Sequence, residues 1–173
     1  MNDTDDTAWP RQIFDLLVEG GVSLFAYVPD AGNKAIIELA DAHNETRTVL
    51  LSAEEEGIAI CAGADLVGQR AVLCMQSSGV GNCPNFLSLT TGGRFPLLMI
   101  VSMRGDYGEQ NPWQYPMGQA VVPVLEAMGI VIIRLDRPED LATATTAALS
   151  AAFKAGQGVA LILSQQFLGA KSF

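Results

Sequence analysis

The sequence is poor in positive charge. Among its 173 residues, Lys and Arg number 10, only three of them Lys, against 19 Asp and Glu. The net charge of −9 argues against a nucleic-acid or anionic-membrane surface, because phosphate groups repel an acidic protein. No apolar run approaches the roughly 18 residues of a membrane span, and the first residues are acidic where a secretory or mitochondrial leader is basic. These absences predict a cytoplasmic protein without nucleic-acid or membrane partners.

Residues that bind metals or act as nucleophiles are also scarce. His43 is the single histidine, and there is no His pair, CxxC or HExxH spacing, so we expect no metal site built by this chain. Serine and cysteine nucleophiles lack a plausible histidine partner. Cys61, Cys74 and Cys83 are odd in number and lie inside predicted elements, which indicates buried thiols in a reducing compartment.

Short β-rich runs alternate with helical patterns. Several runs are almost continuously apolar, which is typical of parallel strands with helices on both faces. The expected strands are Leu24–Val28, Arg47–Leu51, Ala71–Gln76, Leu97–Ser102, Ile130–Leu135 and Val159–Leu163. The expected helices are Trp9–Glu19, Lys34–Ala42, Glu54–Val67, Cys83–Thr91, Met117–Met128 and Pro138–Ala155. The alternation predicts a doubly wound, mainly parallel six-stranded α/β sheet with helices on both faces. The length fits one domain, residues 9–173, after an acidic extension at residues 1–8.

Ligands of such sheets bind outside the carboxyl ends of the strands. The segments to consider are therefore Pro29–Asn33, Ser52–Gly57, Ser77–Asn82, Met103–Met117 and Ser164–Phe167. The Gly79-Val80-Gly81 turn follows a strand and precedes a helix. Its amides can face an anion or a flat ring, but glycines also form tight turns that bind nothing, and the pattern leaves both interpretations open.

Three consecutive acids, Glu54, Glu55 and Glu56, open a predicted helix. Successive helical residues are about 100° apart, so at most one of these side chains can point into a cleft. Two interpretations remain open. The acids favour the positive end of the helix dipole, or one of them works as a proton shuttle at a partly buried site.

The connection Met103–Tyr115 is long, polar and aromatic, which is typical of functional loops. It can close over a substrate or dock on another subunit. Within it, Arg104 is expected either to recognise an acidic substrate group or to form a surface ion pair.

Three segments, Glu54–Ala64, Met75–Asn82 and Gln114–Ala120, resemble the pyrimidine-binding domain of thiamine diphosphate-dependent decarboxylases. The resemblance is greatest to sulfopyruvate decarboxylase alpha subunits, followed by phosphonopyruvate decarboxylases. It extends in the expected order from about Trp9 to Gln165.

The resemblance implies a catalytic glutamate at the start of the second helix of the motif, where it hydrogen-bonds the aminopyrimidine and helps to remove the thiazolium C2 proton. Family spacing, nine positions before Gly63, selects Glu54, and a one-residue shift selects Glu55. The residues implied to contact the cofactor are Pro29, Asp30, Ser78, Gly79, Gly81 and Asn82. Gln114 and Met117 are implied to face the substrate or a subunit interface.

The family binds diphosphate and Mg²⁺ through a Gly-Asp-Gly motif that this sequence lacks, since Gly105-Asp106-Tyr107 breaks it. The resemblance therefore implies a half-site, with the diphosphate and Mg²⁺ ligands on a beta subunit, in a hetero-oligomer built from dimers. The implied reaction converts sulfopyruvate to sulfoacetaldehyde and CO₂. Aromatic surface at Phe86, Trp113 and Tyr115 would then be an interface.

Two other functions remain open at this point. One is a subunit of a phosphonopyruvate decarboxylase. The other is a non-catalytic doubly wound module that binds an acyl, nucleotide or flavin-like ligand or regulates a partner, which the Gly79–Gly81 turn and the acidic loop also support.

Overall fold

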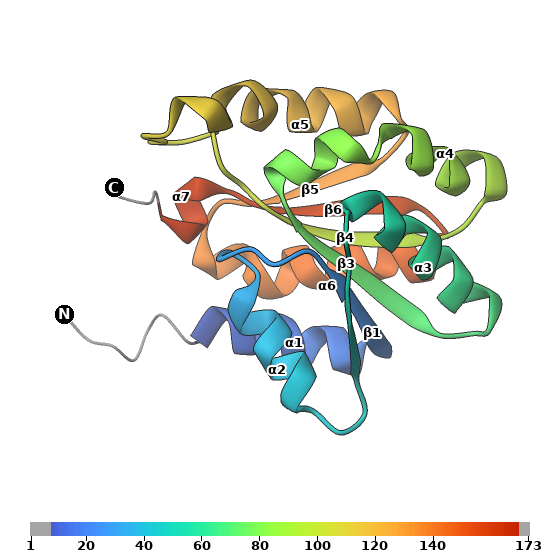
Figure 1. Ribbon diagram of the computed structural model, residues 1–173. Helices are drawn as coiled ribbons and strands as arrows, with labels where there is room; N and C mark the ends of the chain where they lie inside the picture. The colour runs from blue at the N-terminus through green and yellow to red at the C-terminus, as the bar shows by residue number, and fades with distance from the viewer. Residues whose placement is uncertain (1–7, 170–173) are drawn as a thin grey trace.

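Six strands form one sheet in which every pairing is parallel, which confirms the predicted α/β class (Figure 1). The computed structural model describes residues 8–169. The strands are β1 (Val22–Tyr27), β2 (Arg47–Leu50), β3 (Arg70–Gln76), β4 (Leu97–Ser102), β5 (Val131–Leu135) and β6 (Gly158–Leu163). Their spatial order is β2-β1-β3-β4-β6-β5. The fully buried strands β4 and β6 are the almost continuously apolar runs of the sequence.

Helices cover both faces of the sheet (Figure 1). On one face lie α1 (Ala8–Glu19), α2 (Lys34–Ala42) and α6 (Leu141–Phe153); on the other lie α3 (Glu54–Leu66), α4 (Pro84–Gly93) and α5 (Tyr115–Ala127). Each layer buries its own apolar cluster against the sheet, and Phe25, Ile100 and Leu161 pack on the α1 side while Met75 and Met99 pack on the α3 side. Among residues 8–169, no helix has the length and apolar character that crossing a membrane requires.

Most element boundaries agree with the sequence prediction to within two residues. The exception is the segment predicted as one helix from Pro138, which begins as a 3-10 turn (Pro138–Asp140) and becomes α6 only at Leu141. Helix α5 begins at Tyr115 rather than Met117, because Pro116 occupies a first-turn position where its missing N–H costs nothing. Apart from Ala8, where α1 begins, the predicted acidic extension lies outside the described residues.

The strand order places a crevice between β1 and β3. The chain leaves β1 toward α2 on one face, whereas it leaves the neighbouring β3 toward α4 on the other face. Where connections diverge in this way, the carboxyl ends of the strands leave room for a ligand. The segments that follow β1, β3 and β4 are therefore the ones that position a site.

Candidate functional site

Glu54 lies against the short helix η1 (Ser77–Asn82) that follows β3. It is the first residue of α3, and its Oε2 accepts a hydrogen bond of 2.8 Å from Asn82 Nδ2. A Cβ added to Gly79 would overlap the Cγ, Cδ and Oε1 atoms of Glu54. The absence of a side chain at Gly79 is therefore what allows the carboxylate to rest on this loop.

The three consecutive glutamates have three different environments. Glu54 and Glu55 are half-buried, and Glu55 Oε2 is a buried oxygen without a hydrogen-bond partner among the described residues. Glu56 is exposed, and its Oε2 accepts a hydrogen bond of 2.9 Å from the Ser52 amide. Glu56 thus satisfies backbone at the helix start, whereas the two half-buried carboxylates remain available for chemistry.

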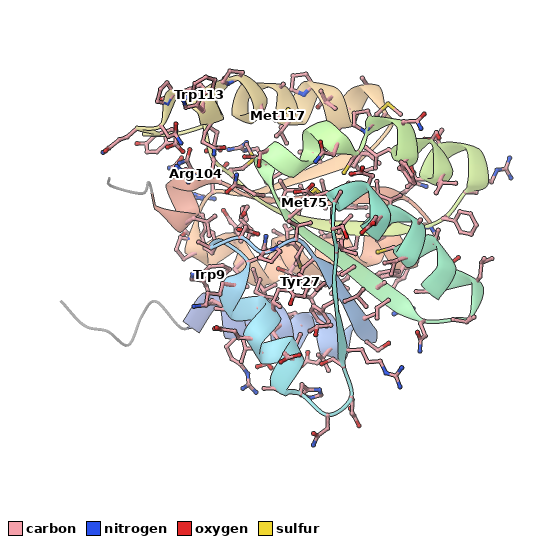
Figure 2. The ribbon with its side chains drawn as sticks, in the orientation of Figure 1. Trp9, Tyr27, Met75, Arg104, Trp113 and Met117 are labelled. Atoms are coloured by element: carbon pink, nitrogen blue, oxygen red, sulfur yellow. The ribbon has the colours of Figure 1, made fainter. Side chains whose placement is uncertain are left out.

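The loop after β3 also contacts the start of α5. Gln76 Nε2 donates to Ser78 Oγ at 2.8 Å and to Gln114 Oε1 at 3.4 Å. A Cβ added to Gly81 would lie 3.1 Å from the Met117 sulfur, and Figure 2 shows Met117 on α5. The structure therefore brings Gln114 and Met117 to the loop that contains Ser78, Gly79, Gly81 and Asn82.

Asp30 belongs to a separate part of the same sheet edge. Its Oδ1 accepts hydrogen bonds from Ser102 Oγ at 2.7 Å and from the Gly32 amide at 2.6 Å, and its Oδ2 accepts one from Asn33 Nδ2 at 2.9 Å. Within residues 8–169, no hydrogen bond joins Asp30 to Glu54 or to η1. Pro29 is exposed beside it. These contacts fix the loop after β1 to the end of β4.

A cavity of about 240 Å³ opens at the carboxyl ends of β1, β3 and β4. Its lining includes Asp30, Gln76, Ser102 and Arg104, closed from the other side by Trp9. Figure 2 shows Arg104 and Trp9 on opposite sides of this edge of the sheet. Gln76 lines the cavity and donates to Ser78 Oγ, so it connects the cavity wall to the loop after β3, whereas Glu54 and η1 are not part of the lining.

The connection between β4 and α5 is organised around a buried carboxylate that the sequence did not reveal. Glu109 accepts two hydrogen bonds from Arg104, one of 2.9 Å from Gln165 Nε2, and others from backbone amides of its own loop. The Arg104 hydrogen bonds, more than any other contact, hold the pKa of Glu109 well below its usual range. The ion pair is mostly buried, so neither expectation for Arg104, substrate recognition or a surface pair, describes its main contact.

The three cysteines are buried, as predicted. All three thiols are free, and burial raises the pKa of Cys61 and of Cys83 to about 12. His43 is the C-terminal capping residue of α2. Within residues 8–169, no group of three or more His, Cys, Asp or Glu side chains is arranged to hold a metal ion.

Glu109 and Gln165 hold this connection in place, and the sequence pattern indicates neither of them. An acid five positions after an arginine in a polar loop is weak evidence for a pair, and Gln165 lies 56 positions further along the chain. The apolar pattern of the strands contains no information about such a contact.

No protein-family model matches the sequence. The alpha subunit of sulfopyruvate decarboxylase from Methanocaldococcus jannaschii is 33% identical over 151 residues, which are 87% of this chain and 89% of that subunit. The sulfopyruvate decarboxylase of Methanosarcina acetivorans is 30% identical over 132 residues, which are 76% of this chain and 34% of that protein.

Among solved structures, the 2-oxoglutarate:ferredoxin oxidoreductase of Magnetococcus marinus superposes on 93% of this chain with a TM-score of 0.74. The identity is 16%, and the match covers 29% of the oxidoreductase chain. The chain therefore shares the fold of one part of a much longer protein.

Proposed function

This chain belongs to the family of sulfopyruvate decarboxylase alpha subunits, and on that basis we propose that it binds the pyrimidine end of thiamine diphosphate in a 2-oxo acid decarboxylase. The substrate is sulfopyruvate, which loses CO₂ to give sulfoacetaldehyde. The observation that carries the proposal is the placement of Glu54 on the Gly79–Asn82 turn, at the carboxyl edge of a parallel sheet.

The residues around Glu54 fit an aminopyrimidine. Glu54 Oε1 takes part in no hydrogen bond within residues 8–169, so it can exchange a proton with a ring nitrogen. Gly79 has no side chain, and the Cγ, Cδ and Oε1 atoms of Glu54 fill the space that a Cβ would take, so the carboxylate rests directly on the backbone of the turn. Ser78, Gly81 and Asn82 belong to the same turn, and Pro29 and Asp30 reach the edge from β1.

These positions indicate which part of the reaction belongs to the cofactor and which to residues of this chain. When bound, the cofactor supplies the electron sink that decarboxylation requires. Glu54 holds and moves the proton at the pyrimidine, a role for which a positioned carboxyl group contributes about 10²- to 10⁴-fold to the rate. Gln114 and Met117 border the loop on the side of α5.

The proposal assigns the diphosphate and Mg²⁺ ligands to a beta subunit. No arrangement of acids within residues 8–169 suits a metal ion, and the sequence lacks Gly-Asp-Gly. The chain also covers about a third of the Methanosarcina acetivorans enzyme but most of the Methanocaldococcus jannaschii alpha subunit. We assign contacts to the sulfonate to the partner as well, because this acidic chain supplies few cationic donors. We place the resulting hetero-oligomer in the cytoplasm.

The test compares three neighbouring variants in the complex with a beta subunit, thiamine diphosphate and Mg²⁺. Glu54→Gln should lower sulfoacetaldehyde formation at least about 100-fold, because glutamine cannot exchange a proton with the ring. Glu56→Gln is the matched control and should retain turnover, because Glu56 is exposed and only caps the helix.

Three results would correct the proposal. Loss of activity in Glu55→Gln with wild-type turnover in Glu54→Gln would transfer the role to Glu55, whose buried Oε2 has no partner. Full activity in both variants would exclude a glutamate at this helix start. Tight nucleotide binding by the chain alone, with no decarboxylation in the complex, would favour a ligand-binding module.

A further inference from the structure

We propose that Asn82 is a positioning residue that fixes the direction of the Glu54 carboxylate. This inference rests on the proposed function of Glu54. The Asn82 side-chain amide donates to Glu54 Oε2 at 2.8 Å, and the two residues are 28 positions apart on different elements. In this role Asn82 acts on the reaction through Glu54, in addition to the cofactor contact that the resemblance implies.

The position of Glu54 explains why it needs such a contact. A glutamate at the first turn of a helix has three rotatable side-chain bonds, and its carboxylate faces no preceding turn that restrains it. Ala53, the residue before it, offers no side-chain hydrogen bond. Gly79 supplies the surface on which the side chain rests, and Asn82 supplies the direction.

The turn that presents Asn82 is itself well supported. The Cys83 amide donates to the Val80 carbonyl at 3.1 Å, and Ser77 Oγ accepts a hydrogen bond of 3.0 Å from the Arg104 amide. Val80 is fully buried. A donor on a supported turn costs little further ordering when it binds Glu54, so the contact favours one carboxylate orientation.

The hydrogen bond also divides the two carboxylate oxygens between different tasks. Oε2 is occupied by a neutral donor, which leaves Oε1 as the oxygen that exchanges a proton. The interaction separates Glu54 from its neighbours, since Glu56 binds the Ser52 amide and Glu55 Oε2 has no partner among the described residues. Of the three glutamates, Glu54 is thus the one that Asn82 holds against the turn.

The experiment uses the complex with the beta subunit and compares Asn82→Ala with Asn82→Asp. Asp has nearly the same shape as Asn, but it removes the donor and adds a charge beside Glu54. We expect kcat to fall about 10- to 100-fold in Asn82→Ala and at least as far in Asn82→Asp, with KM for sulfopyruvate nearly unchanged. The rate at which the bound cofactor exchanges its C2 hydrogen with deuterium, measured by NMR without substrate, should fall in parallel.

A control residue and a double-mutant cycle complete the design. Asn85→Ala should leave both rates unchanged, because Asn85 is exposed on α4 and its side chain makes no hydrogen bond within residues 8–169. Asn82→Ala should cost nothing further in a Glu54→Gln background, because the two groups act as a unit. In the full chain without cofactor, Glu54→Gln should shift the Asn82 side-chain amide resonances, and Glu56→Gln should not.

The outcomes separate this inference from the proposed function. Activity retained in Asn82→Asp but lost in Asn82→Ala would show that Asn82 only fills space, and the inference would be wrong. Effects that multiply in the double mutant would show direct action on cofactor or substrate, which also overturns it. Wild-type turnover in Glu54→Gln would instead overturn the function proposed for Glu54.

Discussion

Arg104 binds Glu109 through two of its guanidinium nitrogens, and the Glu109 side chain has no exposed surface. The pair joins the two ends of the turn that follows β4. Because Gln165 also donates to Glu109, the pair connects this turn to α7 (Gln165–Leu168) after β6. The almost fully exposed Trp113 lies further along the same connection, just before α5 (Figure 2).

Removing Arg104 should destabilise the chain strongly. Arg104→Ala leaves the Glu109 charge buried and lowers the free energy of unfolding by about 3–5 kcal/mol. Urea denaturation measures this change. Arg11→Ala is the matched control: the Arg11–Asp15 pair is exposed, so its loss should change stability little. Equal effects of the two substitutions would contradict a buried role for Arg104.

The Glu109 carboxylate should make stability depend on pH in the acidic range. Because hydrogen bonds from Arg104 hold its folded pKa below the reference value of 4.5, ionised Glu109 stabilises the fold fully above that pH. The contribution decreases as the pH falls further. The difference in unfolding free energy between wild type and Glu109→Gln should therefore be constant near neutrality and narrow toward pH 3. A difference that does not change with pH would contradict this assignment.

Two helical glycines should respond in opposite directions to alanine. A Cβ on Gly118 in α5 would overlap the backbone of Arg104 and Gly105, so Gly118→Ala should lower the unfolding free energy by about 1–3 kcal/mol. A Cβ on the exposed Gly63 in α3 meets nothing within 4 Å. Gly63→Ala should raise stability by about 0.5–1 kcal/mol through helix propensity. Calorimetric melting of both variants measures the two changes in stability. Destabilisation by Gly63→Ala would contradict the open space at that position.

The thiols should be unreactive in the native chain. Burial, with smaller contributions from Glu54 and Glu55, raises the pKa of Cys83 to about 12, and burial does the same for Cys61. Iodoacetamide at pH 8 should label neither until the chain unfolds, because the thiolate is the reacting species. Rapid labelling of native Cys83 would show that the loop beside Glu54 opens.

The sequence predicts the class of fold better than it predicts the order of the strands in the sheet. Continuous apolar runs such as Leu97–Val101 identify buried parallel strands. Glycine or proline near the ends of helices indicates where many of the helices begin or end. The spatial order of the strands is not contained in that pattern, because strands that are apolar on both faces resemble one another. The insertion of β6 between β4 and β5 therefore appears only in the structure.

Likewise, some residues of the candidate site are indicated by the sequence and others appear only in the structure. Composition and spacing alone left the Gly79–Gly81 turn and the acidic helix start open to structural explanations. The resemblance selected Glu54 and Asn82, which the structure places in contact, while the catalytic role of Glu54 stays a prediction. The Arg104–Glu109–Gln165 cluster joins residues far apart in sequence, and no periodicity indicates it.

The late position of β6 in the chain has a consequence for biosynthesis. β5 is an edge strand whose neighbour in the sheet is β6, and β6 also completes the hydrogen bonding of β4. A polypeptide from which β6 is missing can form the part of the sheet made by β2, β1, β3 and β4, but β5 then has no neighbouring strand. The sheet can therefore be completed only after almost all of the described chain is made, and until then one edge of β4 has no partner strand.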